Sequence, residues 1–221
     1  MNRALAYADD CLILGQRLAE WAARAPTLEE DVALLNLSLD LVGVARTLYG
    51  SVGDEDELAY LRPEPEWTNA LLFELPGGDF GQTMARQLLA SAFHVLLWES
   101  LLDDPELGGV AGKAVKEARY HLDHARTWVI RLGDGTPESH RRVQEGLDAV
   151  WPYAFELFED CPDLLDPWTA VVEAVLAEAT LAVPATDWRP TGGRSGRHTE
   201  TFGYLLAELQ HLHRSHPGAT W

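Results

Sequence analysis

Apolar residues recur along this chain with a spacing of three to four, and no stretch alternates between apolar and polar residues as a half-buried strand does. The pattern predicts helices separated by short breaks rich in Pro, Gly and Asp. The predicted helices cover about residues 3–24, 28–50, 53–62, 79–103, 106–133, 137–161, 166–183 and 199–214.

Local signals mark several of the predicted helix starts. Thr27, with Glu30 three residues later, has the signature of a capping box. Asp79 follows a Pro-Gly-Gly turn and is expected to cap the next long helix. Thr136 followed by Pro137 predicts another start, because proline has the backbone angle of a first helical turn and no N–H to leave unpaired.

Long helices, short connections and the lack of a strand pattern predict an all-α fold, a four-helix bundle with additional short helices. Several of the predicted helices exceed 20 residues, so each of these is roughly 30 Å long or more at 1.5 Å per residue. No linker poor in apolar residues interrupts the pattern. We therefore expect a single helical domain over residues 1–221.

The charge balance narrows the classes of partner. The chain has 17 basic and 35 acidic residues, a formal net charge of −18, which argues against nucleic acid and anionic membranes. It shows neither a signal peptide nor an uninterrupted apolar run of about 18 residues. Cys11 and Cys161 cannot form a disulfide framework or a metal-type pair. We expect a cytoplasmic protein.

Polar residues interrupt the apolar faces at helical spacing. Asn36 and Asp40 are four residues apart, as are Gln16 and Glu20, and Arg86 shares a stripe with His94. Buried charge is costly unless it is paired, so these side chains must meet one another, a ligand or water. We predict one buried polar network, and its members are Glu20, Asn36, Asp40, Arg86, Lys113, Lys116, Glu117, Tyr120 and His121.

Inward acids and histidines in a four-helix bundle also raise the hypothesis of a carboxylate-bridged di-iron site. Such a site needs Glu from two helices and a Glu-x-x-His motif from each of two others. Only Glu208 and His211 form that motif here. The alternative to a non-catalytic network is therefore an autonomous di-iron or mononuclear oxidase, with the ligands Glu117, His121, His124, Glu208 and His211.

A segment rich in glycine and arginine stands out in this acidic chain, between residues 188 and 198. Its cationic side chains, Arg189, Arg194, Arg197 and His198, could bind a phosphate or the carboxylates of a partner. They could equally pair with acids of the chain itself. No Walker-type, Gly-x-Gly-x-x-Gly, His-Glu-x-x-His or Gly-x-Ser-x-Gly motif is present.

Five long segments are similar to a known family. They are YADDCLILGQRLAEW, LNLSLDLVGVAR, DFGQTMARQLLASAFHVLLWE, KAVKEARYHLDHARTWVIRLGDGT and TGGRSGRHTETFGYLLAELQHLHRSHPGATW. In this order and over nearly the whole chain they resemble the structural C subunits of bacterial 1,2-phenylacetyl-CoA epoxidases. One departure is His211, where the resemblance implies an aromatic residue.

The resemblance implies a ferritin-like helical fold and a role in aerobic phenylacetate degradation. It implies a homologous catalytic A subunit that holds the di-iron centre, with a reductase and accessory subunits, and a C subunit that lacks iron ligands and stabilises the catalytic one. We therefore expect no cofactor and no catalytic residue in this chain, and a homodimer when it is isolated. The expected counter-charges for Glu20, Asp40 and Glu117 are Arg86, Lys113, Lys116 and Arg119. An acidic chain is a poor binder of CoA thioesters, with the arginine segment as the local exception.

Overall fold

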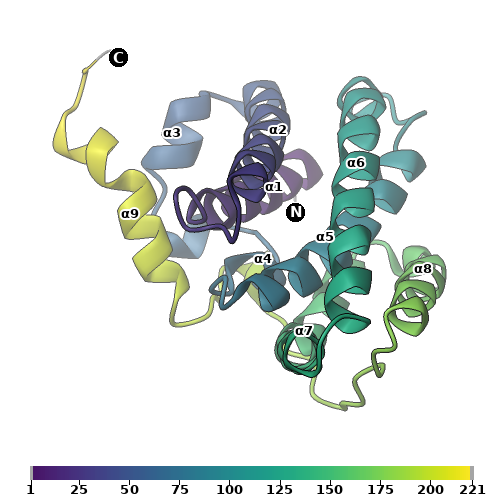
Figure 1. Ribbon diagram of the computed structural model, residues 1–221. Coiled ribbons are helices and arrows are strands. Elements are labelled where there is room, and N and C mark those ends of the chain that lie inside the picture. Colours follow the sequence, from purple (N-terminus) through teal and green to yellow (C-terminus); the bar gives the residue numbers. More distant parts are fainter. Residues whose placement is uncertain (1, 220–221) are drawn as a thin grey trace. The chain divides into compact units, whose positions relative to one another are not determined.

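The computed structural model describes residues 2–219, and within this range it contains helices and no strand. The all-α, ferritin-like fold predicted from the sequence is confirmed. The chain divides into two compact units (Figure 1). We call residues 1–76 with 191–221 the terminal unit and residues 77–190 the central unit. The single domain over residues 1–221 stays a prediction.

The terminal unit is built on a hairpin of two long helices, α1 (Arg3–Ala19) and α2 (Leu28–Val52), which pack against each other (Figure 1). The helices come close at Gly15, where an added Cβ would lie 3.3 Å from the carbonyl oxygen of Ser38. The Ser38 hydroxyl donates a hydrogen bond of 2.8 Å to the carbonyl of Gly15 at this point. The helices that complete the unit are α3 (Glu55–Tyr60), α4 (Leu71–Glu74) and α9 (Phe202–Ser215).

The central unit is organised around α5. Its helices are α5 (Phe80–Ser100), α6 (Gly108–Gly133), α7 (Pro137–Val150) and α8 (Leu165–Glu178), and the last three all pack on α5. Trp168 of α8 is fully buried, and its indole N–H donates a hydrogen bond of 2.9 Å to the carbonyl of Leu89. The rings of Trp151 and Phe158 pack against Trp168, so aromatic side chains join α8 to the rest of the unit.

The helix starts read from the sequence are confirmed. Thr27 caps α2 by accepting a bond from the Glu30 N–H, and Asp79 caps α5 through the Gln82 N–H. A complete capping box is found at Thr136, where Ser139 makes the reciprocal bond to the backbone N–H of the cap.

Several helix ends differ from the prediction. The first helix ends at Ala19 rather than 24, because the chain turns there and Ala23 has a left-handed conformation. The helix from 137 ends at Val150, since Pro152 has no N–H to continue it, and residues 151–158 form a tighter 3-10 helix. The last two helices are shorter than predicted, and α4 is an element that the pattern did not indicate.

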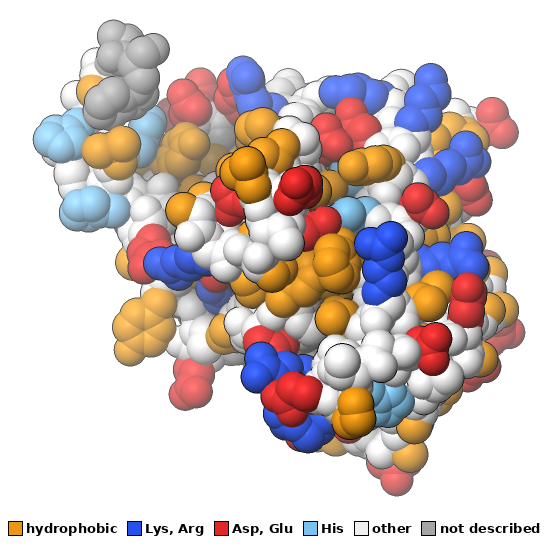
Figure 2. Space-filling model, viewed as in Figure 1, with side chains coloured by type: hydrophobic (Ala, Val, Ile, Leu, Met, Phe, Trp, Pro, Cys, Tyr) orange, Lys and Arg blue, Asp and Glu red, His pale blue; other side chains and the backbone are white. Residues whose placement is uncertain are grey.

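Helix α2 is long and apolar enough to span a membrane by length and composition alone, although Asp40 interrupts its apolar run. A core helix of a soluble protein has the same composition. One face of α2 is buried, with Leu34, Leu37 and Leu48 fully so. Acidic and basic side chains are interspersed over the face of the molecule seen in Figure 2.

Two helix-interior glycines should respond oppositely to the same substitution. In Gly146→Ala the new Cβ would lie 2.5 Å from the Cα of Gln82, so α5 and α7 must move apart, and we expect a loss of about 1–3 kcal/mol in the free energy of unfolding. In Gly112→Ala nothing lies within 4 Å, so better helix propensity should add about 0.5–1 kcal/mol. Urea unfolding measures both, and equal effects would contradict the close crossing.

Candidate functional site

Two consecutive aspartates of α1, Asp9 and Asp10, are buried in the terminal unit. The Asp9 carboxylate accepts a hydrogen bond of 2.6 Å from the Tyr49 hydroxyl and forms a buried ion pair with Arg62. The backbone N–H and the hydroxyl of Thr68 donate to its other oxygen, at 2.8 and 3.0 Å. Every lone-pair direction of this carboxylate is therefore used within the fold, and burial together with the Asp9 charge raises the pKa of Tyr49.

Asp10 is held by an arginine from the far end of the chain. Arg194 donates from its two terminal nitrogens to the two oxygens of Asp10, at 2.9 and 2.7 Å, and the Ala70 N–H adds a bond of 2.8 Å. Arg194 also donates to the carbonyl of Thr68. Burial nevertheless raises the pKa of the Asp10 carboxyl to about 6, against the opposing effects of Arg194 and the Ala70 N–H.

Arg62 lies between aromatic rings. Its guanidinium is 4.3 Å from the ring centre of Trp67 and 5.6 Å from that of Tyr49. The backbone carbonyl of Arg62 accepts from Gln210 of α9 at 3.0 Å, so the same residue also holds the C-terminal helix. This packing fixes the guanidinium plane against Asp9.

A third buried acid, Glu74, contacts the segment that leads into α9. Its carboxylate accepts from the Thr199 N–H at 3.2 Å, and its second oxygen lies 3.4 Å from Nδ1 of His198. The other ring nitrogen of His198 is 3.2 Å from the carbonyl oxygen of Trp67 and must carry a proton to donate to it. Arg17 donates to the Glu74 backbone carbonyl.

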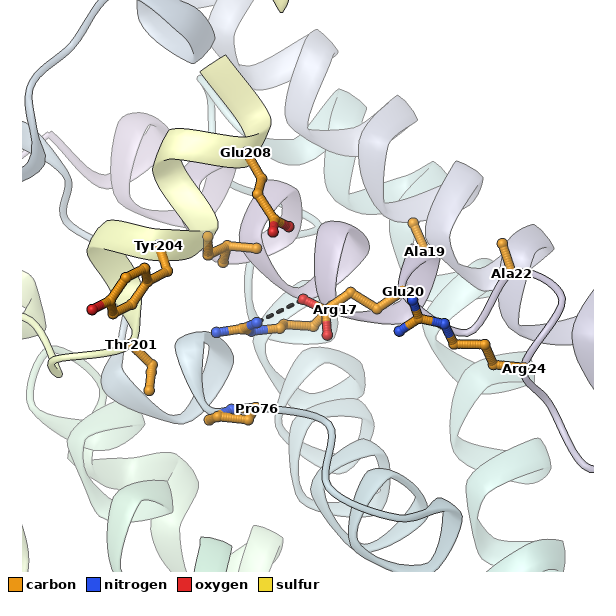
Figure 3. Close-up of a pocket in the computed structure, with 10 residues that line it drawn as sticks. Arg17, Ala19, Glu20, Ala22, Arg24, Pro76, Thr201, Tyr204 and Glu208 are labelled. Carbon is orange, nitrogen blue, oxygen red and sulfur yellow. Dashed lines mark hydrogen bonds and ion pairs between the residues drawn. The ribbon is translucent and has the colours of Figure 1, made fainter. Parts of the chain in front are cut away.

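A cavity of about 570 Å³ opens beside Arg17 in the terminal unit (Figure 3). Arg17 donates to Glu20 across its wall at 2.6 Å, and α9 contributes Tyr204 and Glu208. Arg24 also lines the space, so two arginines are matched by two glutamates. This balance disfavours a ligand with several phosphates, because the carboxylates of Glu20 and Glu208 would repel it.

The network predicted from the sequence is only partly buried. Arg86 and His121 are buried, while Glu20, Asp40 and Glu117 are partly buried. The prediction of burial was wrong for four members of the network, because these side chains are exposed: Asn36, Lys113, Lys116 and Tyr120. Glu20, Asn36 and Asp40 belong to the terminal unit and the other six to the central unit.

The error on α6 has a simple cause. The buried face of this helix consists mainly of small residues, among them Ala111, Ala114, Ala118 and Ala125. Lys113, Lys116 and Tyr120 lie on other faces, and Lys113 pairs with Glu117 at 3.4 Å near the surface. Arg119, another expected counter-charge, pairs with exposed Glu99. The weakly hydrophobic alanines decide which face packs, because they let α6 approach α5 closely.

The arginine segment serves several purposes. The expectation of a phosphate or partner site was wrong for Arg194 and His198, whose side chains are buried on Asp10 and on Glu74 and Trp67. Arg189, in the central unit, lies with its guanidinium 3.8 Å from the ring centre of Phe155. Arg197 is exposed, so only Arg189 and Arg197 present themselves to solvent.

The alternative metal ligands are dispersed. Glu208 and His211 are both exposed on α9, while His121 is buried and His124 partly buried on α6. Among the side chains of residues 2–219, no three His, Cys, Asp or Glu are grouped so that they could hold a metal ion. The expectation that the chain carries no metal stays a prediction.

Asp9, Asp10, Arg62 and Glu74, which dominate the buried charge, were missed by the sequence analysis. The pair Asp9-Asp10 was nevertheless a visible signal in the sequence, because two adjacent acids interrupt an otherwise apolar segment. Arg62 lies in the connection after α3, and Glu74 ends the four-residue helix α4; both segments are too short for periodicity to indicate a buried face.

Removing Arg194 should be far more damaging than removing its neighbour Arg197. Arg194→Met leaves the Asp10 carboxylate buried without its ion pair, and we expect a loss of about 3–5 kcal/mol in the free energy of unfolding. Arg197→Met alters an exposed side chain and should change the free energy of unfolding by less than about 0.5 kcal/mol. Denaturant unfolding compares the two, and equal losses would refute a specific role for Arg194.

The Asp10 carboxyl should make stability depend on pH. Its pKa is raised from 3.8 to about 6, so the native chain holds this proton at higher pH than the unfolded chain does. Its contribution to the free energy of unfolding is fully present below pH 3.8 and is lost as the pH rises through 6. The loss totals about 3 kcal/mol. Asp10→Asn has no such titration, so the stability advantage of the wild type should shrink between about pH 4 and pH 7. If the stability advantage of the wild type grew with pH instead, Arg194 would lower the pKa of Asp10 by more than burial raises it.

Comparison with known proteins gives two concordant results. The family described as phenylacetic acid catabolic protein matches residues 1–221. The chain is 43% identical, over 248 aligned residues that cover all of both chains, to the C subunit of 1,2-phenylacetyl-CoA epoxidase from Escherichia coli (strain K12). With a family match over its entire length and this degree of identity, the chain belongs to the family of phenylacetic acid catabolic proteins.

Proposed function

We propose that this chain is the scaffold subunit of a di-iron monooxygenase that epoxidises the aromatic ring of phenylacetyl-CoA in the cytoplasm. It stabilises the homologous catalytic subunit that holds the iron, and works with a reductase and accessory subunits. The observation that carries the proposal is the 43% identity to the C subunit of such an epoxidase over the full length of both chains.

The donor set of the chain supports a non-catalytic role. A di-iron centre needs paired Glu-x-x-His motifs, and the one motif present, Glu208 with His211, is exposed. At the corresponding spacing in α6, Glu117 is followed by exposed Tyr120. The residues present therefore do not fit a di-iron centre.

The way in which the inward acids are neutralised also supports it. Asp9 and Asp10 pair with Arg62 and Arg194. Glu20 pairs with Arg17. Arginine stays charged at all ordinary pH values, so these pairs maintain the fold without offering an open ligand position.

The purified full-length chain should produce no epoxide from phenylacetyl-CoA, with electron donor and oxygen supplied, and should hold far less than one iron per chain. Mixed with the iron-bearing catalytic subunit, it should form a stable complex, raise the Tm of the iron-bearing chain and restore turnover. Light scattering, iron quantification and product analysis measure these properties.

Glu208→Ala provides the control for the metal alternative, because Glu208 is exposed and belongs to the single Glu-x-x-His motif. We expect the variant to form the complex and support turnover as the wild type does. About two iron atoms per isolated chain, with oxygen or peroxide chemistry that Glu208→Ala abolishes, would overturn the scaffold assignment in favour of an autonomous oxidase.

A further inference from the structure

Two polar side chains are buried one turn apart on α5. Gln87 is fully buried, and Ser91 is 1% exposed. Because the two residues are four positions apart, their Cβ atoms lie about 5–6 Å from each other on one side of the helix. Every residue from Thr83 to His94 is buried, so bulk water does not reach this part of α5. We call these two residues the Gln87–Ser91 pair.

Three polar groups of this pair have no hydrogen-bond partner among residues 2–219. They are the amide nitrogen and the amide oxygen of Gln87 and the hydroxyl of Ser91, and each atom is almost completely inaccessible. An unpaired buried polar group lowers the folding equilibrium constant by roughly 5- to 150-fold. Three such groups in one turn of a core helix would remove much of the stability of a typical domain, so the pair needs partners.

Other hydroxyl groups on the helices of this chain are satisfied by their own helix. Thr47 and Thr169 donate to the carbonyl four residues earlier, at 2.9 and 2.8 Å, and Ser100 donates to the carbonyl three residues earlier at 2.8 Å. The Ser91 hydroxyl makes no such bond. Since rotation about χ1 would bring a helical serine to that carbonyl, the hydroxyl of Ser91 is turned toward a different partner.

A second buried glutamine shows what direct pairing gives. Gln210 is 2% exposed, and its amide nitrogen donates to the carbonyls of Ala59 and Arg62 at 3.3 and 3.0 Å. Gln87 is buried more deeply and has no bond of this kind. The Gln87–Ser91 pair offers N–H and O–H donors together with oxygen acceptors, and it carries no charge. Water both donates and accepts, so it satisfies such a set better than an ion of either sign.

We propose that the Gln87–Ser91 pair is an internal water site, in which one ordered water bridges the Gln87 amide and the Ser91 hydroxyl. Two hydrogen bonds of about 2.8 Å through one water oxygen span up to about 5.6 Å, which matches the spacing of one helical turn. A second water completes the bonds of the amide, because its donor and acceptor ends point in different directions. The site lies in the core of this chain and does not depend on the proposed function.

Magnetisation transfer from water in NMR tests the site on the full-length chain, with nitrogen-15 in the glutamine side chains. The Gln87 amide should show cross peaks to a water that tumbles with the protein, and Gln87→Met identifies its signals by their loss. The Gln210 amide is the control, because it donates to two carbonyls and should show no such cross peak. A Gln87 amide without cross peaks to bound water would overturn the proposal.

A double-mutant cycle tests whether the two residues share a water. Gln87→Met keeps the length of the side chain but leaves the bridging water and Ser91 short of a partner, so the unfolding equilibrium constant should rise about three- to tenfold. Ser91→Ala should then have a smaller effect in the Gln87→Met background than in the wild type. In the Gln210→Met background its effect should be unchanged. Urea unfolding gives the constants, and circular dichroism verifies that each variant folds.

A lower unfolding constant in Gln87→Met would contradict the water site, because it would mean that an unpaired amide had been removed from a dry core. Strictly additive effects of Gln87→Met and Ser91→Ala would contradict the shared water. A high-resolution crystal structure should show ordered water at hydrogen-bond distance from the Gln87 amide and from Oγ of Ser91. Protein atoms at those positions instead would refute the proposal.

Discussion

The terminal unit depends on the neutralisation of two adjacent carboxylates inside its first helix. Asp9 and Asp10 are buried, and neither could remain there ionised without a counter-charge. Arg62 and Arg194 supply it, from positions 53 and 184 residues further along the chain. The ion pairs therefore determine which distant segments must pack on α1. Apolar contact alone would allow these irregular segments many arrangements, whereas a bidentate guanidinium allows few.

The same buried charge links fold and function. Inward carboxylates in a helical bundle can be balanced by a metal or by cationic side chains, and the two choices have different chemical consequences. A metal brings open coordination positions and redox chemistry, while a guanidinium brings only charge and directional hydrogen bonds. Asp9 and Asp10 are balanced in the second way. In the proposed complex, this chain would then contribute a rigid helical surface and leave oxygen activation to its partner.

The sequence predicted helix type and most helix starts, because periodicity and capping are local properties. Thr27, Asp79 and Thr136 cap helices as expected. Side-chain environment was harder, because it depends on which face packs. On α6 the conspicuous charged residues drew attention, whereas the alanines turned inward and left Lys113 outside. The partner of Asp10 could not be inferred from sequence, since a separation of 184 residues leaves no periodic or local signal.

The two-unit organisation has a consequence for biosynthesis. The central unit, residues 77–190, is inserted between the two parts of the terminal unit. During translation, α1 emerges first with its aspartates, yet Arg194 and the residues that cover Glu74 are made last. The nascent chain must therefore carry an incomplete terminal unit while the central unit is synthesised, with Asp10 in water or protonated. The contacts of Asp10 with Arg194 and of Glu74 with Thr199 can form only after the chain has been translated beyond Thr199. The first helix therefore reaches its native buried state only after that point of synthesis.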